Sequence, residues 1–138
     1  MFKRLIIASF LLTSVGCSLL AQESDRGQYN SLDPQEFLSS RQLFDRPHPR
    51  QVALALFEEN TRESEGRKSE AISIEYPTWE LAIVTIAIVG LADDSLRGLR
   101  YRLEFQYNDS HWQLDWVGSQ VQCREGRGHQ NWGRDRCL

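Results

Sequence analysis

The sequence predicts an α+β fold, in which N-terminal helices pack on a four-stranded, curved antiparallel meander. Three observations lead to this prediction. The chain has 138 residues, of which 41% are apolar and 25% charged, so it suits one domain with one modest core. Apolar residues recur at helical spacing before residue 60 and at alternate positions after residue 70. Short turn sequences separate the alternating segments, which favours consecutive antiparallel strands.

Two helices are expected first. Asp33 stands before Pro34 and can cap the N-terminus of one helix. Pro47 interrupts that helix, and Pro49 can open the next, which fades in the charged residues 60–67. Apolar residues at helical spacing mark the face that each helix should bury. These residues are Phe37, Leu38, Leu43 and Phe44 in the first helix and Val52, Ala53, Leu56 and Phe57 in the second.

Four strands are expected to follow. Pro77 should break or bulge the edge of the first. The next segment is nearly all apolar, so it is predicted to be the central strand and to be buried on both faces. A helix lying across the concave face would give a layout that resembles cystatin-like or NTF2-like architecture, and this likeness implies no function. The expected strands are Glu70–Tyr76, Trp79–Val89, Leu99–Tyr107 and Trp112–Val121, with a turn at 108–110 before the last.

Residues 1–21 are predicted to be an export signal. Lys3 and Arg4 form a basic start, and the apolar residues 5–12 that follow are too few to span a bilayer. Small residues come next, as they do before a cleavage site. The protein is therefore expected to be periplasmic or extracellular.

Two forms of processing stay open. One cut falls after Ala21. The other interpretation takes residues 14–17 as a bacterial lipobox, with Ser where Leu is usual, and makes Cys17 the lipidated first residue. Residues 22–32 are polar and are predicted to form a flexible tether, followed by a single domain over residues 33–138.

The cysteine count also fits export. Three cysteines are an odd number for an exported protein, and removing or lipidating Cys17 leaves Cys123 and Cys137. These two are expected to join in an oxidising compartment and to close a loop worth roughly 3 kcal/mol. The cysteine and histidine spacing matches no metal site, and no cofactor is expected. A net charge of −3 argues against nucleic acid as a partner.

Two loops are the candidate functional regions, residues 90–98 and residues 123–132. Both are rich in polar residues, the second also carries a tryptophan, and loops of this kind on a stiff scaffold often carry binding sites. The proposed disulfide would close the second loop. The candidate ligand-binding residues in the two loops are Arg97, Arg127, His129 and Trp132.

Asp93 and Asp94 have two interpretations. Adjacent acids in a turn usually accept hydrogen bonds from nearby main-chain N–H groups. They could also bind a cation, or act as acid and base with His129, whose ordinary pKa lies near neutrality. No activated nucleophile is recognisable beside them. Arg127 is expected to reach back to Asp93 or Asp94 and join the two loops through a charge-assisted contact.

The remaining candidates are assigned structural roles. Arg100 and Arg102 fall on the outward face of a strand, where they are expected to pair with acids across the sheet. Trp112 or Trp116 is expected to fill the core rather than to form a sugar or peptide platform. Trp132 is expected to cover the disulfide.

Three motifs in the second half of the chain occur in a fixed order. They are GLADDSLRGLRYRLEF, then W-x-L-x-W-V-G-x-Q-x-x-C, then GRGHQNW before a final cysteine. This combination, within about residues 79–137, resembles a family of small exported bacterial proteins and lipoproteins. The resemblance implies bacterial export and a Cys123–Cys137 link, and it implies no activity.

The sequence therefore favours an exported, non-catalytic binding or accessory domain. Its expected partner is a small ligand or an envelope protein, and the membrane is contacted only if a lipid is attached at Cys17. The alternative is a small hydrolase that uses Asp93 or Asp94 with His129. That alternative requires a carboxylate and the imidazole within hydrogen-bonding distance in an open pocket.

Overall fold

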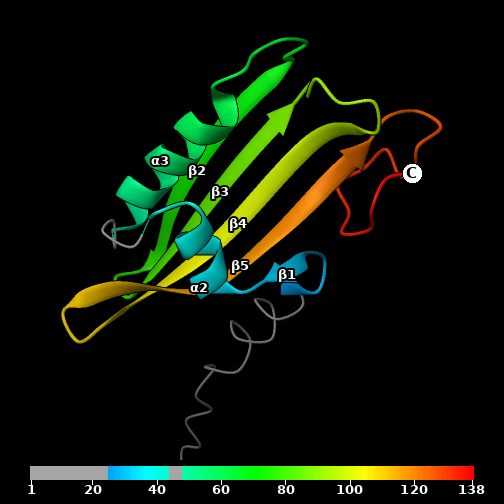
Figure 1. Cartoon of the computed structure of the whole chain (residues 1–138). Helices are drawn as coiled ribbons and strands as arrows, with labels where there is room; N and C mark the ends of the chain where they lie inside the picture. The colour runs from blue at the N-terminus through cyan, green and yellow to red at the C-terminus, as the bar shows by residue number, and fades with distance from the viewer. Residues whose placement is uncertain (1–24, 44–47) are drawn as a thin grey trace, which may run out of the picture.

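The computed structural model describes residues 25–43 and 48–138, and it has one antiparallel sheet with two helices (Figure 1). The α+β class is confirmed. The predicted leader, its lipobox with Cys17, and Phe44 lie outside the described residues. Within the described ranges, neither helix is long and apolar enough to cross a membrane.

The sheet has five strands rather than the four predicted. Their order across the sheet is β1-β5-β4-β3-β2, and every neighbouring pair is antiparallel. The middle strand is therefore β4 and not the apolar strand β3, because β1 adds to the far side of β5. The elements are β1 (Asn30–Leu32), α2 (Pro34–Ser40), α3 (Pro49–Thr61), β2 (Ser69–Thr78), β3 (Leu81–Val89), β4 (Leu96–Asn108) and β5 (His111–Cys123).

The fifth strand lies in the segment predicted to be a flexible tether, so that prediction is wrong over residues 25–32. β1 pairs with β5 from Asn30 opposite Ser119 to Leu32 opposite Val117. Just before it, Tyr29 is only 8% exposed. Burial of this aromatic side chain, the β1–β5 ladder and the ion pairs of Asp25 and Arg26 together oppose the entropy cost of ordering the segment, so it lies fixed on the sheet.

Both helices begin where the sequence predicts. The Asp33 carboxylate accepts the N–H of Glu36 at 2.7 Å, and Pro34 opens α2. The Nδ1 atom of His48 accepts the N–H of Arg50 at 3.2 Å at the start of α3. Figure 1 shows that both helices lie across the same face of the sheet, with α3 over β2 and β3.

The core fills the space between these helices and the sheet. Along β3, the residues that face the helices are fully buried, whereas the alternate residues on the opposite face are only half buried. The prediction that this strand is buried on both faces is therefore wrong, because both helices lie on one side. The core residues are Phe37, Leu43, Val52, Ala53 and Leu56 from the helices and their loop, and Ala82, Val84, Ile86, Ile88, Leu103, Phe105, Leu114 and Val117 from the strands.

The β2–β3 and β4–β5 turns lie together at one end of the sheet, and the β3–β4 connection and the C-terminal loop lie at the other (Figure 1). The β2–β3 pairing shifts register between Glu75 and Thr78, where Pro77 cannot donate a ladder hydrogen bond. Trp79 lies in the turn and is 74% exposed, so its predicted place in a buried strand is wrong. In the β4–β5 turn, Asp109 and Ser110 both have positive φ, as a two-residue type I′ turn requires.

Candidate functional site

Cys123 and Cys137 form the predicted disulfide, with sulfur atoms 2.08 Å apart and Cα atoms 5.4 Å apart. The loop that it closes folds back along the end of β5. Gly133 exchanges two main-chain hydrogen bonds with Val121, at 2.8 and 3.0 Å. A Cβ atom on Gly128 would lie 2.9 Å from the Cys123 sulfur, so the chain passes close to the disulfide there. The C-terminal segment is thus held against the sheet edge.

The contact between the two candidate loops is made by Arg124 and not by Arg127. The Arg124 guanidinium donates to the main-chain oxygens of Asp93 and Leu91, at 2.6 and 2.7 Å. The prediction that Arg127 binds a carboxylate of the other loop is wrong. β5 ends at Cys123, so the next residue faces the 90–95 loop, whereas Arg127 follows a turn and is exposed.

Of the two interpretations of Asp93, the structure supports the structural one, in which its carboxylate accepts main-chain N–H groups. Its carboxylate accepts the N–H groups of Leu96 and Ser95, at 2.6 and 2.8 Å, and these hydrogen bonds lower the pKa of the Asp93 carboxyl. Asp94 is exposed in the same turn. Arg97 is also exposed, and its main-chain oxygen accepts the N–H of Gly90 at 2.7 Å. The turn is therefore organised by the Asp93 carboxylate and by hydrogen bonds of its own main chain.

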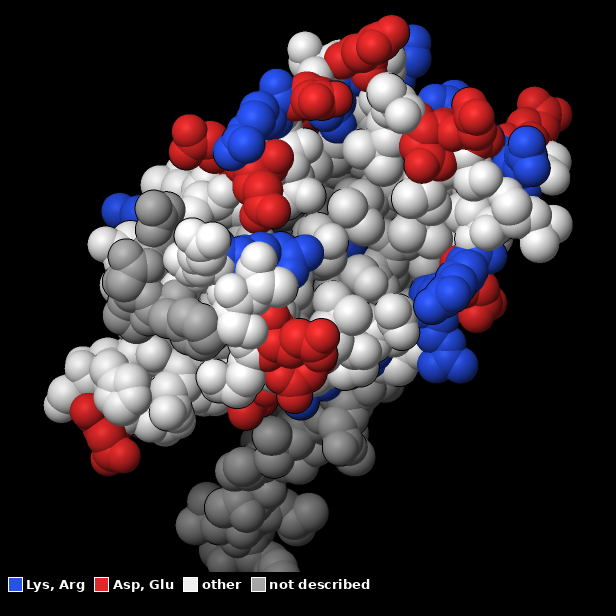
Figure 2. Space-filling view, viewed as in Figure 1, with Lys and Arg blue, Asp and Glu red and all other residues white. Residues whose placement is uncertain are grey.

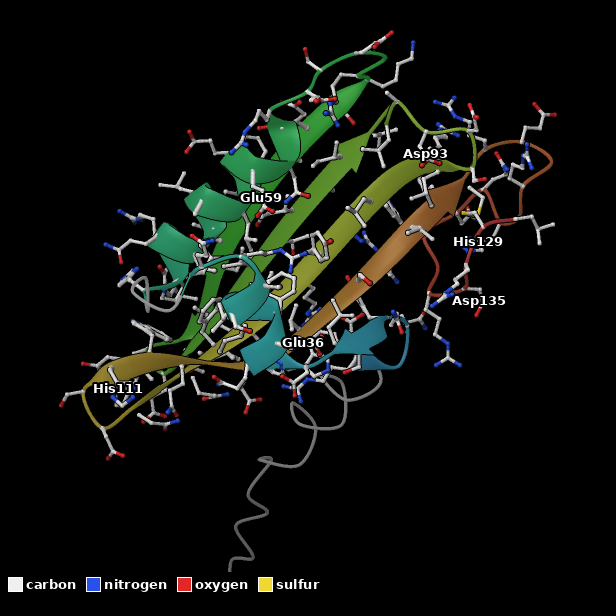
Figure 3. All side chains as sticks on the ribbon, viewed as in Figure 1. Glu36, Glu59, Asp93, His111, His129 and Asp135 are labelled. Carbon is white, nitrogen blue, oxygen red and sulfur yellow. A yellow bond between two sulfur atoms is a disulfide. The ribbon has the colours of Figure 1, made fainter. Side chains whose placement is uncertain are left out.

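Both ring nitrogens of His129 also contact main-chain oxygen atoms. Nε2 lies 2.9 Å from the oxygen of Asp135, and Nδ1 lies 2.8 Å from the oxygen of Asn131. Because carbonyl oxygens can only accept, these contacts favour a ring that carries both protons and raise the pKa of His129. Figure 3 shows His129 and Asp135 on the C-terminal loop and Asp93 on the neighbouring loop. Neither Asp93 nor His129 makes the acid–imidazole contact that the hydrolase alternative requires.

Trp132 lies on the sheet face that the helices leave free. The prediction that it covers the disulfide is therefore wrong. Its ring centroid is 4.8 Å from the Arg100 guanidinium carbon, and its ring passes close to Gly98 of β4. Arg100 in turn donates to the side-chain oxygen of Gln120 across the strand, with Nε at 2.9 Å. The predicted cross-strand partner of Arg100 is thus an amide rather than an acid.

The same free face carries a buried carboxylate that the sequence did not reveal. Glu104 has no exposed surface, and its two oxygens accept from Arg26 at 2.6 Å and from Arg102 at 3.0 Å. Arg102 also pairs with Asp25, and Arg26 also pairs with Asp115 at 3.0 Å. Alternation along β4 marks Glu104 as outward, and nothing in its sequence neighbourhood shows that residues 25–29 cover it.

A hollow of about 380 Å³ adjoins the C-terminal loop. Charged side chains of both signs line it, namely Asp93, Arg134, Asp135 and Arg136. Of the four predicted ligand-binding residues, which are Arg97, Arg127, His129 and Trp132, none is among its lining residues. The hollow beside the C-terminal loop is therefore not lined by the predicted ligand-binding residues.

A larger cavity, of about 460 Å³, lies at the hairpin end between the helices and the β4–β5 hairpin. Its volume falls in the range of small-molecule sites. Its wall combines apolar side chains with primary amides and a tryptophan. The lining residues are Pro34, Gln35, Leu38, Leu43, Val52, Phe105, Gln106, Asn108, Trp112, Gln113, Leu114 and Asp115.

Trp112 connects this cavity to a group of aromatic rings at the hairpin turns, named here the aromatic cluster and made of Tyr76, Trp79, Tyr107 and Trp112. Ring centroids are 6.3 Å apart from Trp79 to Tyr107, 5.2 Å from Tyr107 to Trp112 and 6.1 Å from Trp112 to Tyr76. Tyr76 is 45% exposed. The sequence correctly placed Tyr76, Tyr107 and Trp112 in strands, and only Trp79 lies outside one. That the four rings meet was not predicted, although aromatic residues beside the β2–β3 and β4–β5 turns were the available signal.

Figure 2 shows mainly uncharged surface at the described part of the hairpin end, at the lower left of the view, with one acidic side chain at its tip. Acidic side chains also gather at the lower centre, and side chains of both signs gather along the upper and right-hand edges. Across residues 25–43 and 48–138, no group of three or more His, Cys, Asp or Glu side chains is placed to hold a metal ion. Comparisons with protein families, with curated proteins and with solved structures found no match to this chain.

Proposed function

We propose that this chain is an exported, non-catalytic binding domain whose ligand site is the 460 Å³ cavity together with the aromatic cluster. The observation that carries the proposal is the position of Trp79, which is 74% exposed and is linked through the Tyr107 ring to Trp112 in the cavity wall. A large ring left in water beside a hollow is typical of a binding surface. The proposal includes a cystatin-like or NTF2-like layout, because the helices lie across one face of a curved sheet (Figure 1).

Export is supported by the disulfide and by the leader. A Cys123–Cys137 bond is favoured in an oxidising compartment, such as the bacterial periplasm or the cell exterior. The basic and apolar start of the chain is typical of a signal peptide. Cleavage after Ala21 would release the domain, whereas lipidation of Cys17 would anchor it. The proposed relationship to a family of small exported bacterial proteins rests on the motifs quoted above.

The C-terminal loop supports a binding role less well than the hairpin end. His129 and Asp93 use their polar atoms on main-chain groups of their own loops. A hydrolase needs a ring nitrogen that can accept a proton, and both nitrogens of His129 face carbonyl oxygens. The loop is therefore proposed as a structural closure of the sheet edge, with Arg97 and Arg127 as exposed cations beside it.

The test is a ligand screen by ¹H–¹⁵N NMR on the oxidised protein, with probes from three classes: neutral oligosaccharides, blocked tetrapeptides and lipid headgroups. We expect saturable shifts of main-chain signals at Gln106, Trp112 and Gln113, while the ligand signals stay unchanged over a day. Consumption of a ligand would identify an enzyme and overturn the proposal. Shifts confined to residues 123–138 would move the site to the other end of the sheet.

Export is tested by the intact mass of the protein recovered from a bacterial envelope. The expected masses correspond either to cleavage after Ala21, or to cleavage between Gly16 and Cys17 with a diacylglyceryl group added to the Cys17 sulfur, in each case less two hydrogens for the disulfide. A full-length, reduced chain recovered from the cytoplasm would contradict the proposal.

A further inference from the structure

We infer that the ligand of this site is an uncharged oligosaccharide, with one sugar unit in the cavity and the next stacked on the exposed aromatic rings. This inference rests on the proposed binding function and adds the chemical class of the ligand. Three properties of the hairpin end carry it: the charge of the lining, its amide side chains and the order of its rings.

The described lining carries no cation that would select an anionic ligand. None of its described residues is a lysine, arginine or histidine. Its one acid, Asp115, is paired with the Arg26 guanidinium at 3.0 Å. A phosphate or carboxylate ligand would lose its hydration here without gaining a cation in return. A peptide with free termini would meet the same difficulty at both of its ends.

The polar part of the lining consists mainly of primary amides, from Gln35, Gln106, Asn108 and Gln113. Each amide carries both donors and an acceptor on one planar group. A sugar hydroxyl also donates and accepts, so neighbouring hydroxyls on one ring can be matched by such amides. These four residues belong to α2 and to both strands of the β4–β5 hairpin.

The aromatic cluster gives the direction of a longer ligand. Trp112 lines the cavity, Tyr107 lies 5.2 Å from it, and Trp79 lies 6.3 Å beyond Tyr107, measured between ring centroids. The electron-rich face of an aromatic ring attracts the C–H face of a sugar ring. Trp79 is 74% exposed, so it can receive a sugar unit that extends out of the cavity. The arrangement therefore suits a chain of sugars better than a single one.

The test uses the full, disulfide-bonded protein, titrated with tetramers of β-1,4-linked glucose, β-1,4-linked N-acetylglucosamine, mannose and galactose. Saturable shifts of the Gln106 and Gln113 signals are expected with at least one of them. Trp79→Ala is expected to weaken that binding by about fivefold to tenfold, as the loss of one ring contact predicts. The matched control is Leu54→Ala, which truncates another exposed apolar residue, 56% exposed on α3 and outside the cavity lining, and should leave binding unchanged.

A second variant tests the neutral lining without removing a ring. Gln113→Glu keeps the shape of the side chain and adds a charge to one residue of the cavity lining, so binding at pH 7 should fall by about threefold to tenfold. Gln130→Glu makes the same change in the exposed C-terminal loop and should have no effect.

The possible outcomes separate the ligand class from the binding function. If none of the tetrasaccharides gives saturable shifts, or if Trp79→Ala and Gln113→Glu both bind as well as the unaltered protein, the carbohydrate inference is overturned. If a blocked tetrapeptide shifts the same cavity signals while no sugar does, the site stands and its ligand is a peptide. If every probe class leaves the cavity signals unmoved, both the inference and the proposed function fail.

Discussion

At the scale of single residues, Glu104 organises the sheet face that the helices leave free. Its carboxylate has no contact with water and accepts hydrogen bonds from two guanidinium groups, those of Arg26 and Arg102. A buried charge is tolerated only when its partners replace the water that it loses. Arg26 and Asp25 come from the N-terminal segment, so Glu104 ties that segment to the middle strand.

We predict that Glu104→Gln lowers the free energy of unfolding by about 2–4 kcal/mol, because it removes the charge but leaves the two arginines in place. Urea unfolding followed by tryptophan fluorescence measures the change. Glu75→Gln on exposed β2 is the control, and it should stay within about 0.5 kcal/mol of the unaltered protein. Equal effects of the two substitutions would show that the buried network does not stabilise the fold.

His129 gives a prediction with a definite sign. Main-chain oxygens of Asp135 and Asn131 accept from its ring and raise its pKa above the ordinary value of 6.5. A raised folded-state pKa means that the stabilising contribution is complete below pH 6.5 and is lost as the pH rises through the folded-state value. The C-terminal loop should therefore be held more firmly in mild acid than at alkaline pH.

The ring C–H signal of His129 in an NMR titration should have its midpoint above 6.5. The Cys123 N–H, which donates to the His129 oxygen at 2.9 Å, should be better protected from hydrogen exchange below that midpoint, after correction for intrinsic rates. His129→Gln should abolish this pH dependence, and His111→Gln at the opposite end should not. A midpoint at or below 6.5 would contradict the assignment of both ring nitrogens as donors.

Among the helices and strands, the segments that the sequence predicted correctly are those with specific capping residues or with enough residues to show a repeating pattern. Asp33 with Pro34 and Pro49 predicted both helix starts correctly, because capping requires specific residue types at fixed positions. Alternation over many residues predicted β4 and β5. β1 has only three residues, too few to show a period of two, and it owes its place to Tyr29 outside it.

The site was harder to predict than the fold. The disulfide followed from counting cysteines, and the Asp93 turn followed from the ordinary chemistry of such turns. The aromatic cluster joins rings from two hairpins, so it depends on strand register that no local pattern specifies. Trp79 was assigned to a strand because no Gly, Asn or Pro separates it from the apolar residues 81–89.

Removal of β1 provides the test at this scale. A chain that begins at Asp25 should unfold like the longer protein, whereas one that begins at Asp33 should lose at least about 3 kcal/mol of unfolding free energy, because it lacks the buried Tyr29 and the partners of Glu104. Both chains are exported behind the same foreign signal peptide and compared by urea unfolding. Equal midpoints would restore the tether prediction for residues 25–32.

At the scale of the whole molecule, one covalent bond closes the end of the sheet that lies opposite the proposed ligand site. Cys123 and Cys137 are 14 positions apart, and the loop between them pairs with β5 and supplies the partners of His129. Joining two such residues limits the freedom of the unfolded chain. The bond also keeps the C-terminal segment beside the 90–95 loop.

Replacing Cys123 and Cys137 with serine should lower the free energy of unfolding by about 3 kcal/mol. A reducing agent should have a comparable effect on the unaltered protein and no further effect on the double variant. Oligosaccharide binding at the hairpin end should survive in the folded variant, because the cavity and the disulfide lie at opposite ends. Unchanged stability after the double substitution would show that the loop is held by its hydrogen bonds alone.

The fixed position of Asp25 on Arg102 sets how far a lipidated form of this protein could work from its membrane. Asp25 lies eight positions after Cys17, and a fully extended chain covers at most about 3.6 Å per position, so the domain would begin no more than about 29 Å from the bilayer surface. A loose chain as far as Leu32 would have allowed about 54 Å by the same rule. A lipidated protein would therefore meet only ligands in the layer next to the bilayer, whereas one released after Ala21 would diffuse through the whole compartment.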